Sequence, residues 1–279
     1  MGVNPFWQED FFLTLQNICH QAEIVDTIPC NIVETEKIAI NLISLDHQLN
    51  SAQLIALQES YQTNGKQLVH LWEDIWLTRR EQVLSRLKSF LDLNNRVHGR
   101  KTKIAGVNVA DTKRFLTENH LQGYVNAKFH YGLYNDSQLI ALASFSGARP
   151  MKSKGENYRS AELVRFASKA GITVVGGLGK LIKHFLGDNP VHDLMTYADR
   201  DWSLGKGYDK MGFEHSETIS PILFYFDPKT ERRYLPNKLP TTATVAFESQ
   251  NSLTLDEFLK ANGYFQVFNT GNLKYFYYT

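Results

Sequence analysis

The chain has 279 residues, of which 43% are hydrophobic and 21% are charged, and its formal net charge is +1 at pH 7. These values describe an ordinary globular chain that is long enough for two domains of roughly 100–200 residues each. The balanced charge excludes a global nucleic-acid signature, so any nucleic acid has to be met by a local patch.

Cysteines are few and no long apolar run occurs. Cys19 and Cys30 are too few for a disulfide framework, and no cysteine or histidine pair has zinc-ligand spacing. No stretch of about 18 apolar residues exists, and the first residues lack a basic segment followed by an apolar one. We therefore expect a cytoplasmic protein with no metal and no membrane contact.

Short apolar runs alternate with helical patterns at the start of the chain. Residues 37–43 and 67–72 have the length and composition of buried strands. Residues 51–63 read as a helix, and residues 77–91 repeat apolar side chains at helical intervals between charged ones. The order predicts a small α/β domain over residues 1–95.

The later part of this domain carries a family resemblance. Residues 65–76 and 83–87 are similar to the end of small PD-(D/E)xK nuclease domains of phage and mobile-element endonucleases. Such nucleases hold Mg²⁺ and activate water with carboxylates on two neighbouring strands. The corresponding positions here are Asn31 and Asn41, and an amide supplies no charge to a hard cation. The resemblance implies a degenerate restriction-endonuclease-like domain in which nuclease activity is not expected.

A basic segment follows. Its composition is typical of a solvated connection between domains, although its cations could also contact phosphate. These cations are Arg96, Arg100, Lys101 and Lys103. We predict a linker over residues 96–107 and a second domain over residues 108–279.

The second domain begins with a helix and a hairpin. Asp111 or Thr112 is expected to cap the helix. Residues 127–134 and 138–145 read as strands joined by the turn residues 135–137.

A strand, a glycine turn, a helix and another strand come next. The apolar run 163–166 precedes residues 174–180, which contain three glycines and lead into apolar residues at helical spacing. Glycines at the mouth of a helix let unpaired N–H groups face outward, and the helix dipole there favours an anion such as phosphate. A second apolar strand is expected over residues 193–198.

This order of parts resembles the GNAT acyltransferase superfamily. The cofactor loop of that family is written Gln/Arg-x-x-Gly-x-Gly/Ala; Gly177 and Gly179 match its glycines, while Val174 replaces the Gln or Arg. Its later helix commonly ends in Tyr-x-Lys-x-Gly-Phe, which residues 208–213 match. The resemblance implies an α/β fold with a mixed central sheet and flanking helices, and an acyl-CoA-dependent N-acyltransferase activity.

The resemblance also implies a place for acetyl-CoA or another acyl-CoA. Its pantetheine arm would lie where the strands near residues 163–168 and 193–198 part, and strand amides at residues 165–167 would polarise the thioester carbonyl. The pyrophosphate would lie on the amides of Val175, Gly176, Gly177, Leu178, Gly179 and Lys180.

Three side chains are catalytic candidates. Tyr208 would protonate the departing thiolate, or it packs the last helix on the sheet. Glu162 and Asp199 are the carboxylates nearest the expected reaction centre, and each is either the base or a solvated residue at a strand end.

Three further side chains would bind the acceptor. Arg165, Arg200 and Trp202 are expected near the same reaction centre. An arginine there binds a polar acceptor, or it forms an ion pair with Asp199 that fastens the strand ends.

A composite resemblance covers nearly all of residues 65–279. Phage and mobile-element proteins that join a nuclease domain to this kind of C-terminal domain show Leu-x-Arg-Phe, Tyr-Ala-Asp-Arg-x-Trp-Ser and Asn/Asp-x-Gly-Asn. Residues 163–166, 197–203 and 269–272 match these motifs. The domain company implies a nucleic acid, DNA or RNA, as partner, and by analogy a base or a nucleic-acid-associated amine as acceptor.

The end of the chain predicts further strands. Residues 221–227 would supply the next strand of the central sheet. Residues 263–268 and 273–278 would form a closing hairpin that turns at residues 269–272.

Two other functions stay open. A catalytically inactive nucleic-acid-binding or regulatory protein is favoured by the missing carboxylates, by the basic segment and by aromatic residues that can stack on bases. An active nuclease would need a metal site rebuilt from Glu34, Glu36 and Asp46.

Overall fold

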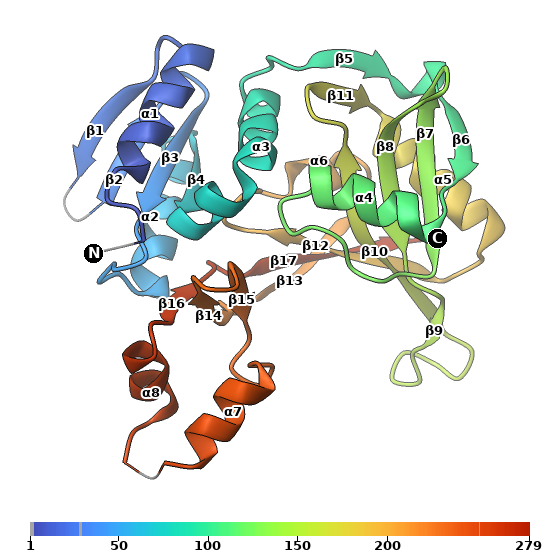
Figure 1. Cartoon of the computed structure of the whole chain (residues 1–279). Helices are drawn as coiled ribbons and strands as arrows, with labels where there is room; N and C mark the ends of the chain where they lie inside the picture. Colours follow the sequence, from blue (N-terminus) through green and yellow to red (C-terminus); the bar gives the residue numbers. More distant parts are fainter. Residues whose placement is uncertain (1–2, 28–29, 251) are drawn as a thin grey trace. The chain divides into compact units, whose positions relative to one another are not determined.

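A computed structural model describes residues 3–27, 30–250 and 252–279, and the chain divides into two compact units (Figure 1). Unit 1 comprises Met1–Thr78, Asp199–Ser203 and Ile219–Asn272; unit 2 comprises Arg79–Ala198, Leu204–Thr218 and Leu273–Thr279. Both units combine helices with β-sheets, so the predicted α/β class is confirmed. Among the described residues, no helix has the length and apolarity needed to cross a membrane.

Unit 1 contains a sheet in the order β1-β2-β3-β4, antiparallel except for the parallel pair β3–β4, and a smaller sheet in the order β15-β14-β16. The predicted helix 51–63 and strand 67–72 are confirmed to the residue. Its elements in chain order are α1 (Trp7–Ile18), β1 (Glu23–Thr27), β2 (Cys30–Glu34), β3 (Ile38–Ile43), α2 (Ser51–Thr63), β4 (Gln67–Trp72), the start of α3 (Glu73–Phe90), β14 (Leu223–Asp227), β15 (Arg232–Tyr234), α7 (Thr241–Glu248), α8 (Leu255–Ala261) and β16 (Phe265–Phe268).

The helix α3 starts earlier than its amphipathic pattern. Glu73 follows β4 directly and is fully buried, because its carboxylate accepts hydrogen bonds from the backbone N–H groups of Asn4 (2.7 Å) and Leu45 (3.0 Å). Arg79 has non-helical dihedral angles inside α3, and the division between the two units falls just before it. Because α3 begins with a buried charged residue, the amphipathic pattern predicted only the later turns of this helix.

Unit 2 is built on a larger sheet in the order β13-β17-β12-β10-β8-β7-β6, with β9 beside β10. The elements that follow α3 in chain order are β5 (Asn95–His98), the 3₁₀ turn η1 (Gly99–Lys101), β6 (Lys103–Gly106), α4 (Val109–Asn119), β7 (Phe129–Asn135), β8 (Gln138–Phe145), β9 (Arg149–Pro150), β10 (Arg159–Ser168), β11 (Ile172–Val175), α5 (Gly177–Asp188), β12 (Asp193–Asp199), α6 (Lys206–Asp209), β13 (Glu214–Ile219) and β17 (Asn272–Tyr278).

The sequence predicted the middle of unit 2 well and its borders poorly. The hairpin of β7 and β8 is confirmed, as are the strand β10, the glycine turn, the helix α5 and the strand β12. The short strand β11, which pairs with β5 outside the large sheet, was not expected between β10 and the turn. The helix α4 is capped by Asn108, whose side chain accepts from the Asp111 N–H at 2.8 Å. Asp111 is therefore the third residue of the helix and not its cap. The expectation of a cap at Asp111 or Thr112 was wrong by three or four residues.

The predicted linker 96–107 carries secondary structure. It contains most of β5, all of η1 and β6; β5 pairs in parallel with β11, and β6 pairs with β7. These short strands are mostly exposed, so their polar and basic composition imitates a solvated connection.

The closing hairpin was a wrong prediction. β16 pairs with β14 in the small sheet of unit 1, whereas β17 lies between β13 and β12 in the large sheet. β14 likewise belongs to the small sheet, so β13 takes the place predicted for residues 221–227. Adjacent β-patterns look alike whether they pair with each other or with different sheets.

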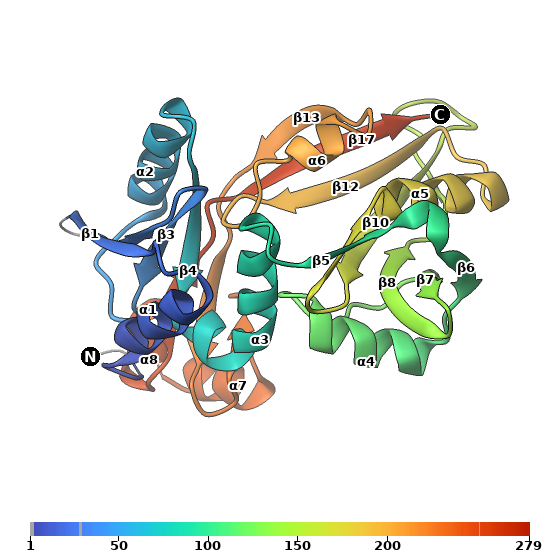
Figure 2. The ribbon, with the colours of Figure 1, turned by 90° about the horizontal axis from the view of Figure 1, so that it is seen from above.

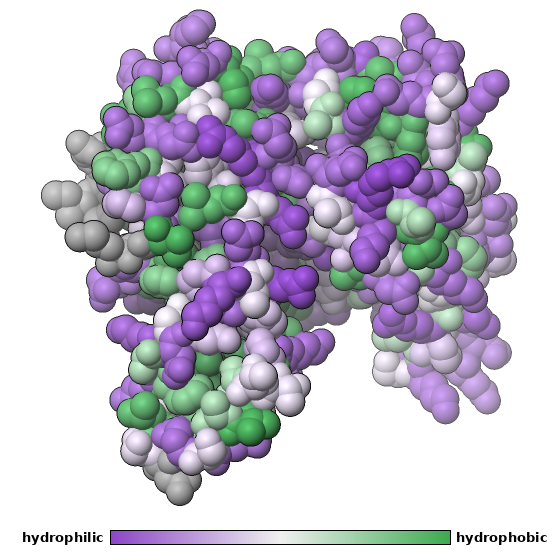
Figure 3. Space-filling model, viewed as in Figure 1, coloured by the Kyte–Doolittle hydropathy of each residue, from purple (hydrophilic) through white to green (hydrophobic). Residues whose placement is uncertain are grey.

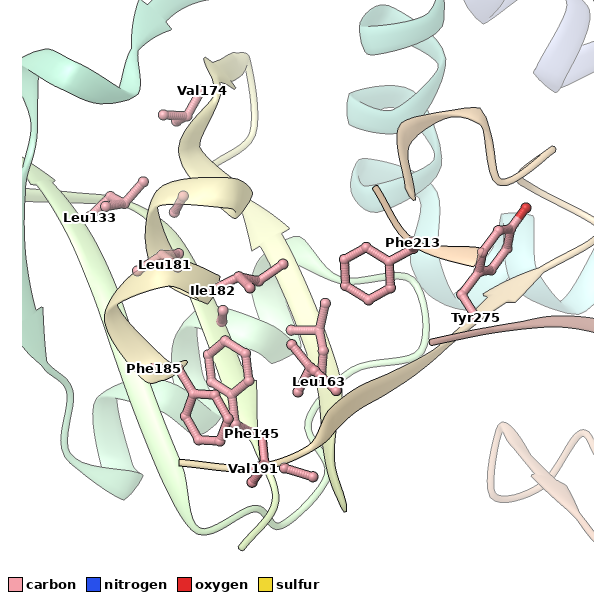
Figure 4. Packing of buried hydrophobic residues seen from close by; sticks show 14 of the residues in the cluster. Leu133, Phe145, Leu163, Val174, Leu181, Ile182, Phe185, Val191, Phe213 and Tyr275 are labelled. Carbon is pink, nitrogen blue, oxygen red and sulfur yellow. The ribbon is translucent and has the colours of Figure 1, made fainter. Parts of the chain in front are cut away.

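The core of unit 2 lies between α5 and one face of the large sheet (Figure 4). Phe145 of β8 stacks on Phe185 of α5 with ring centroids 4.2 Å apart. Leu163 of β10 and Leu181 of α5 are buried beside them. On the opposite face, α4 packs Phe115 and Leu116 against the sheet. This sandwich holds the glycine turn and β10 at fixed places within one unit.

Two matched motifs interlock in unit 1. The Asp201 carboxylate accepts hydrogen bonds from the Thr270 N–H (2.8 Å) and hydroxyl (2.7 Å), and the Arg200 N–H donates to the Gly271 carbonyl at 3.1 Å. Asp201 and Thr270 are buried. Residues 197–203 and 269–272, which match motifs of the composite resemblance, are therefore joined by hydrogen bonds although they lie far apart in the chain.

The helix α7 has no buried residue, although four of its eight residues are apolar. Val245 is 58% exposed. Figure 3 shows apolar side chains at the surface of the arm that carries α7 and α8.

Gly271 is expected to tolerate no side chain. Its φ is +96°, and a Cβ there would lie 2.2 Å from the Ile219 carbonyl oxygen. Gly263 is a matched control, because its φ is +85° and a Cβ would meet nothing within 4 Å. We expect Gly263→Ala to lower the free energy of unfolding by about 1–2 kcal/mol through backbone strain, and Gly271→Ala by about 1–3 kcal/mol more. Urea denaturation measures both; equal losses would contradict the close packing.

Asp201 makes the stability of unit 1 depend on pH. Burial raises the pKa of its carboxyl to about 6, and the Thr270 hydrogen bonds and the charge of Arg233 oppose that rise only in part. The folded state then binds this proton more tightly than the unfolded state, so the stabilisation by protonation is complete below about pH 4 and is lost as pH rises through 6.

Asp201→Asn keeps the acceptor oxygen and removes the titration. Relative to the wild type, we expect the variant to gain about 2–3 kcal/mol in unfolding free energy between pH 4 and pH 7.5. Denaturant unfolding at several pH values measures the difference. A difference independent of pH would show that Asp201 does not titrate in this window.

Candidate functional site

The central strands β10 and β12 part soon after they pair. Their parallel ladder joins Ser160, Ala161 and Glu162 to Asp193, Leu194 and Met195. β10 then continues to Ser168 and β12 to Asp199, and Figure 2 shows the two ribbons diverging. Beyond Glu162, β10 pairs with β8 alone in the ladders that the structure describes. Over residues 163–168, the described ladders contain no pair between β10 and β12.

β10 is irregular where the divergence begins. Leu163 pairs with Phe145 and Arg165 with Ser144, so Val164 is an extra residue without a cross-strand partner. A bulge of this kind bends a strand and re-aims its groups. The irregularity lies one residue before the amides predicted to polarise a carbonyl.

Where β10 and β12 part, a hydrogen bond from a side chain takes the place of the backbone ladder. The Thr196 hydroxyl of β12 donates to the Leu163 carbonyl at 3.0 Å, and the Tyr208 hydroxyl lies 3.5 Å from the Thr196 oxygen. The Tyr208 ring packs against Phe213 and Tyr275, with centroids 5.3 and 5.4 Å away. The Tyr208 ring therefore packs on the sheet, and its hydroxyl reaches the point where the two strands part.

The surroundings keep Tyr208 protonated. Burial raises the pKa of its phenol, and the Thr196 hydrogen bond and the charge of Arg86 lower it to a smaller extent. A phenol with a raised pKa carries its proton at neutral pH. It is therefore chemically able to donate that proton.

The glycine turn leaves main-chain donors unpaired. Gly176 has a left-handed φ of 72°, α5 begins at Gly177, and the first helical bond runs from the Lys180 N–H to the Gly176 carbonyl at 3.1 Å. Within the described part of the chain, the N–H groups of Gly177, Leu178 and Gly179 have no hydrogen-bond acceptor. Such a helix start favours an anion.

Space above this turn is open at two glycines and closed at the third. A Cβ on Gly176 would meet nothing within 4 Å, and one on Gly179 only the Met211 sulfur at 3.9 Å. A Cβ on Gly177 would instead lie 2.7 Å from a methyl group of Val174 and 2.9 Å from one of Leu133. Gly177 is thus required for core packing, and the open side of the turn belongs to Gly176 and Gly179.

The turn is held by the segment predicted as a linker. Gly99 lies so close that a Cβ on it would be 3.2 Å from the Gly177 nitrogen. The Lys180 ammonium donates to the Gly99 carbonyl at 3.0 Å and also to the Thr102 carbonyl. The Lys180 side chain therefore connects the turn to residues 99–102, and both its backbone N–H and its ammonium group are hydrogen-bonded. Val174, which replaces a polar family residue, is buried in the core.

Glu162 lies at the last paired position before the strands part. Its neighbour Leu163 faces α5, so alternation places the Glu162 side chain on the opposite face, toward α4. Arg165 shares that face, because its partner Ser144 lies between two residues of the α5 core. Glu162 and Arg165 are thus brought to one face of one strand.

The other three predicted side chains belong to the other compact unit. Asp199, Arg200 and Trp202 group with unit 1. Arg200 donates to the Thr270 carbonyl at 3.3 Å and pairs with Glu59 at 3.6 Å. Trp202 is buried, and its carbonyl accepts from Gln67. Arg200 and Trp202 therefore have structural contacts within unit 1.

The two asparagines at the nuclease-like positions lie on opposite faces of the unit 1 sheet. Asn31 pairs with Leu42, so these two side chains share a face, and Asn41 is the neighbour of Leu42. Asn31 donates to Gln8 of α1, whereas Asn41 is fully buried beside His70. Among the residues the structure describes, no group of three His, Cys, Asp or Glu side chains could hold a metal ion.

Thr196 was missed by the sequence analysis. It lies in an apolar strand, where a threonine is an ordinary β-former and carries no motif. Only the partner of its hydroxyl, a carbonyl on a strand 33 residues earlier, gives it a role.

Comparison with known proteins gives distant structural likenesses only. No family model matches the sequence, and a search of curated proteins finds no match. An acetyltransferase of Bacillus subtilis in complex with CoA is 11% identical, covers 64% of this chain and 99% of its own, and superposes with a TM-score of 0.37.

Two other solved structures give similar values. A GNAT family acetyltransferase from Elizabethkingia anophelis with acetyl-CoA bound is 10% identical over 64% of this chain and 99% of its own, with a TM-score of 0.37. An IAA acetyltransferase from Bacillus cereus is 12% identical over the same shares, with a TM-score of 0.36. Superpositions this loose carry no argument, so function has to be argued from the site.

Proposed function

We propose that unit 2 is an acyl-CoA-dependent N-acyltransferase of the GNAT type. The observation that carries the proposal is the parting of β10 and β12 after Glu162, with Tyr208 at the point of divergence. The unpaired amides that begin α5 in the same unit support it. The sequence motifs and the geometry of unit 2 thus both support acyl transfer from acyl-CoA.

The first turn of α5 fits a pyrophosphate. The N–H groups of Gly177, Leu178 and Gly179 would donate to its oxygens, and the absence of side chains at Gly176 and Gly179 leaves room for close approach. When bound, acyl-CoA would supply an acyl group activated as a thioester. Acetyl-CoA is the simplest candidate.

Three groups of β10 and α6 would handle charge and protons. Main-chain N–H groups at the Val164 bulge would stabilise negative charge on the thioester oxygen. Tyr208 would hold a proton at its hydroxyl for the departing sulfur, and Glu162 would accept the proton of the acceptor amine. Asp199 stays a second candidate for the base.

The acceptor is proposed to be an amine of a nucleic-acid base or of a molecule bound to nucleic acid. The nuclease-like motif of residues 65–87 supports this domain company, together with the composite motif likeness to phage and mobile-element proteins. The sheet order of unit 1, three antiparallel strands and then a parallel fourth, accommodates such a domain. Asn31 and Asn41, at the nuclease-like positions of unit 1, support a binding role without nuclease chemistry.

A catalytically inactive nucleic-acid-binding protein is the second candidate. It is favoured by Asn31 and Asn41, which occupy opposite sheet faces in place of metal-binding carboxylates. Salt-dependent binding of labelled DNA or RNA that is unaffected by acyl-CoA would support it.

Equilibrium binding of acetyl-CoA tests the proposed cradle. Gly179→Glu places a carboxylate on the open side of the turn, where it repels a pyrophosphate but suits the first turn of a helix. We expect calorimetry to show acetyl-CoA affinity at least about tenfold lower than in Gly179→Gln, with thermal stability retained. The neutral variant of similar size is the control. No affinity in the wild type at millimolar concentration, or equal affinities of the variants, would remove the proposal.

Tyr208→Phe tests the proton donor. The ring and its packing remain, so we expect acetyl-CoA affinity to stay within about twofold while kcat for CoA release falls by about 100-fold or more. Thiol release in the presence of an accepted amine measures kcat. An unchanged kcat would assign Tyr208 to packing alone.

A further inference from the structure

Three aromatic rings and a carboxylate of unit 2 surround the ammonium group of Lys154. Its Nζ lies 4.1 Å from the centre of the Phe276 ring and 5.1 Å from that of Tyr158. The Tyr278 ring centre is 5.9 Å away, and the Asp193 carboxylate accepts a hydrogen bond from Nζ at 2.8 Å. Such a set of groups recognises alkylammonium ions. We call Tyr158, Asp193, Phe276 and Tyr278 the ammonium cage.

The ammonium cage is held together by contacts that do not involve Lys154. The Tyr158 hydroxyl donates to the Asp193 carboxylate at 2.7 Å, and the Tyr158 ring stacks on His192 with centroids 4.7 Å apart. The Ser160 hydroxyl donates to the other oxygen of the same carboxylate. The two remaining rings both belong to β17 and stack with centroids 6.1 Å apart. The cage is therefore built by groups other than its occupant.

The carboxylate of the cage needs a positive partner. The Asp193 side chain has no exposed surface. Burial by itself raises the pKa of this carboxyl, but the hydrogen bonds from Lys154, Ser160 and Tyr158 bring the pKa below its ordinary value, so the group is ionised at neutral pH. Within the described part of the chain, only Lys154 forms an ion pair with it. Because an unpaired buried charge is costly, a cage without Lys154 favours another cation.

The occupant comes from a loop with few polar contacts to the rest of unit 2. Residues 151–157 are all exposed, and Figure 1 shows that the loop between β9 and β10 projects from the sheet. Among the described residues, the hydrogen bonds of this loop stay within residues 151–158, except for that of the Lys154 ammonium. A local movement of the loop therefore suffices to exchange Lys154 for an external ammonium group.

The ammonium cage lies near the proposed base. Asp193 pairs with the residue of β10 that stands two places before Glu162. The neighbours of these two carboxylates, Leu194 and Ala161, belong to the core against α5, so alternation places both carboxylates on the opposite face of the sheet. Two residues along a strand correspond to about 7 Å. A ligand held in the cage is thus close to Glu162.

We propose that the ammonium cage is a subsite for an alkylammonium group of the acceptor, and that Lys154 occupies it from within until the acceptor binds. The acceptor then carries two amino groups: the cage holds one as an ammonium ion, and Glu162 receives the proton of the other. The role as acceptor subsite rests on the proposed acyltransferase function. Molecules with several ammonium groups also bind nucleic-acid phosphates, in agreement with an acceptor that is bound to nucleic acid.

Lys154→Ala empties the cage, and Lys152→Ala is the matched control because Lys152 is an exposed lysine of the same loop. Butylammonium is the cationic probe, and butanol is the neutral probe of similar size. We expect calorimetry to show that Lys154→Ala binds butylammonium at least about tenfold more tightly than the wild type or Lys152→Ala, and more tightly than it binds butanol. Equal affinities of the three proteins, or of the two probes, would overturn the subsite.

The aromatic wall is tested in the emptied cage. Adding Phe276→Leu to Lys154→Ala keeps an apolar side chain and removes the ring closest to the ammonium group. We expect the butylammonium affinity to fall by about threefold or more. An unchanged affinity would show that the cation binds elsewhere, and the proposal would fail.

Nuclear magnetic resonance of the wild type tests the exchange without a variant. The ε-methylene signals of Lys154 are expected to be shifted by the nearby rings, and saturating butylammonium should move them toward those of an exposed lysine such as Lys152. Lys154 signals that do not respond to butylammonium would contradict the displacement of this side chain.

Acetyl-CoA binding separates this inference from the proposed function, because butylammonium binding requires no cofactor. If acetyl-CoA binds the wild type but Lys154→Ala gains no affinity for butylammonium, the subsite is wrong and the acyltransferase proposal stands. If acetyl-CoA does not bind the wild type, the acyltransferase proposal and the acceptor role of the cage are both wrong. If both ligands bind, Phe276→Leu should raise KM for 1,4-diaminobutane about threefold or more with kcat retained, and an unchanged KM would overturn the acceptor role.

Discussion

The structure of unit 2 depends on a parallel strand pair that ends after three residues. The N–H and C=O groups of a buried strand need hydrogen-bond partners, and where two strands part these groups lose their ladder partners. The Thr196 hydroxyl donates a hydrogen bond to the Leu163 carbonyl, and the bulge at Val164 accommodates the change in strand direction. Because these two adjustments let β10 and β12 separate without collapse, Tyr208 can reach the divergence and α5 can present its amides. The proposed chemistry follows from this separation.

Unit 1 is closed by a polar connection between distant segments. Asp201 is buried and bonded to Thr270, and the next residue, Gly271, has no space for a side chain. Motifs that a resemblance would assign to function are here used, in part, to join residues 199–203 to residues 269–272. The predicted acceptor residues Arg200 and Trp202 belong to this connection, whereas Arg165 does not.

Local patterns predicted most elements and some of the site. The helix 51–63, the strand 67–72 and the hairpin around residues 135–137 were located from periodicity and turn residues, because short-range packing decides them. Tyr208 and the glycine turn were located by motif. Pairing across the sheet is decided by contacts between residues far apart in the chain. The short strands within residues 96–107 were therefore not predicted, the closing hairpin was predicted wrongly, and Thr196 was missed.

The sequence by itself determined the α/β class, the order of the parts in unit 2 and the presence of a helix start rich in glycine. These depend on residue spacing, on the freedom of glycine at positive φ and on apolar periodicity, all of which are local. Only the tertiary structure decided that β10 and β12 part after Glu162, and that Gly177 packs into the core while Gly176 and Gly179 stay open. Such features arise where side chains distant in sequence compete for the same space and the same hydrogen bonds, which no pattern along the chain encodes.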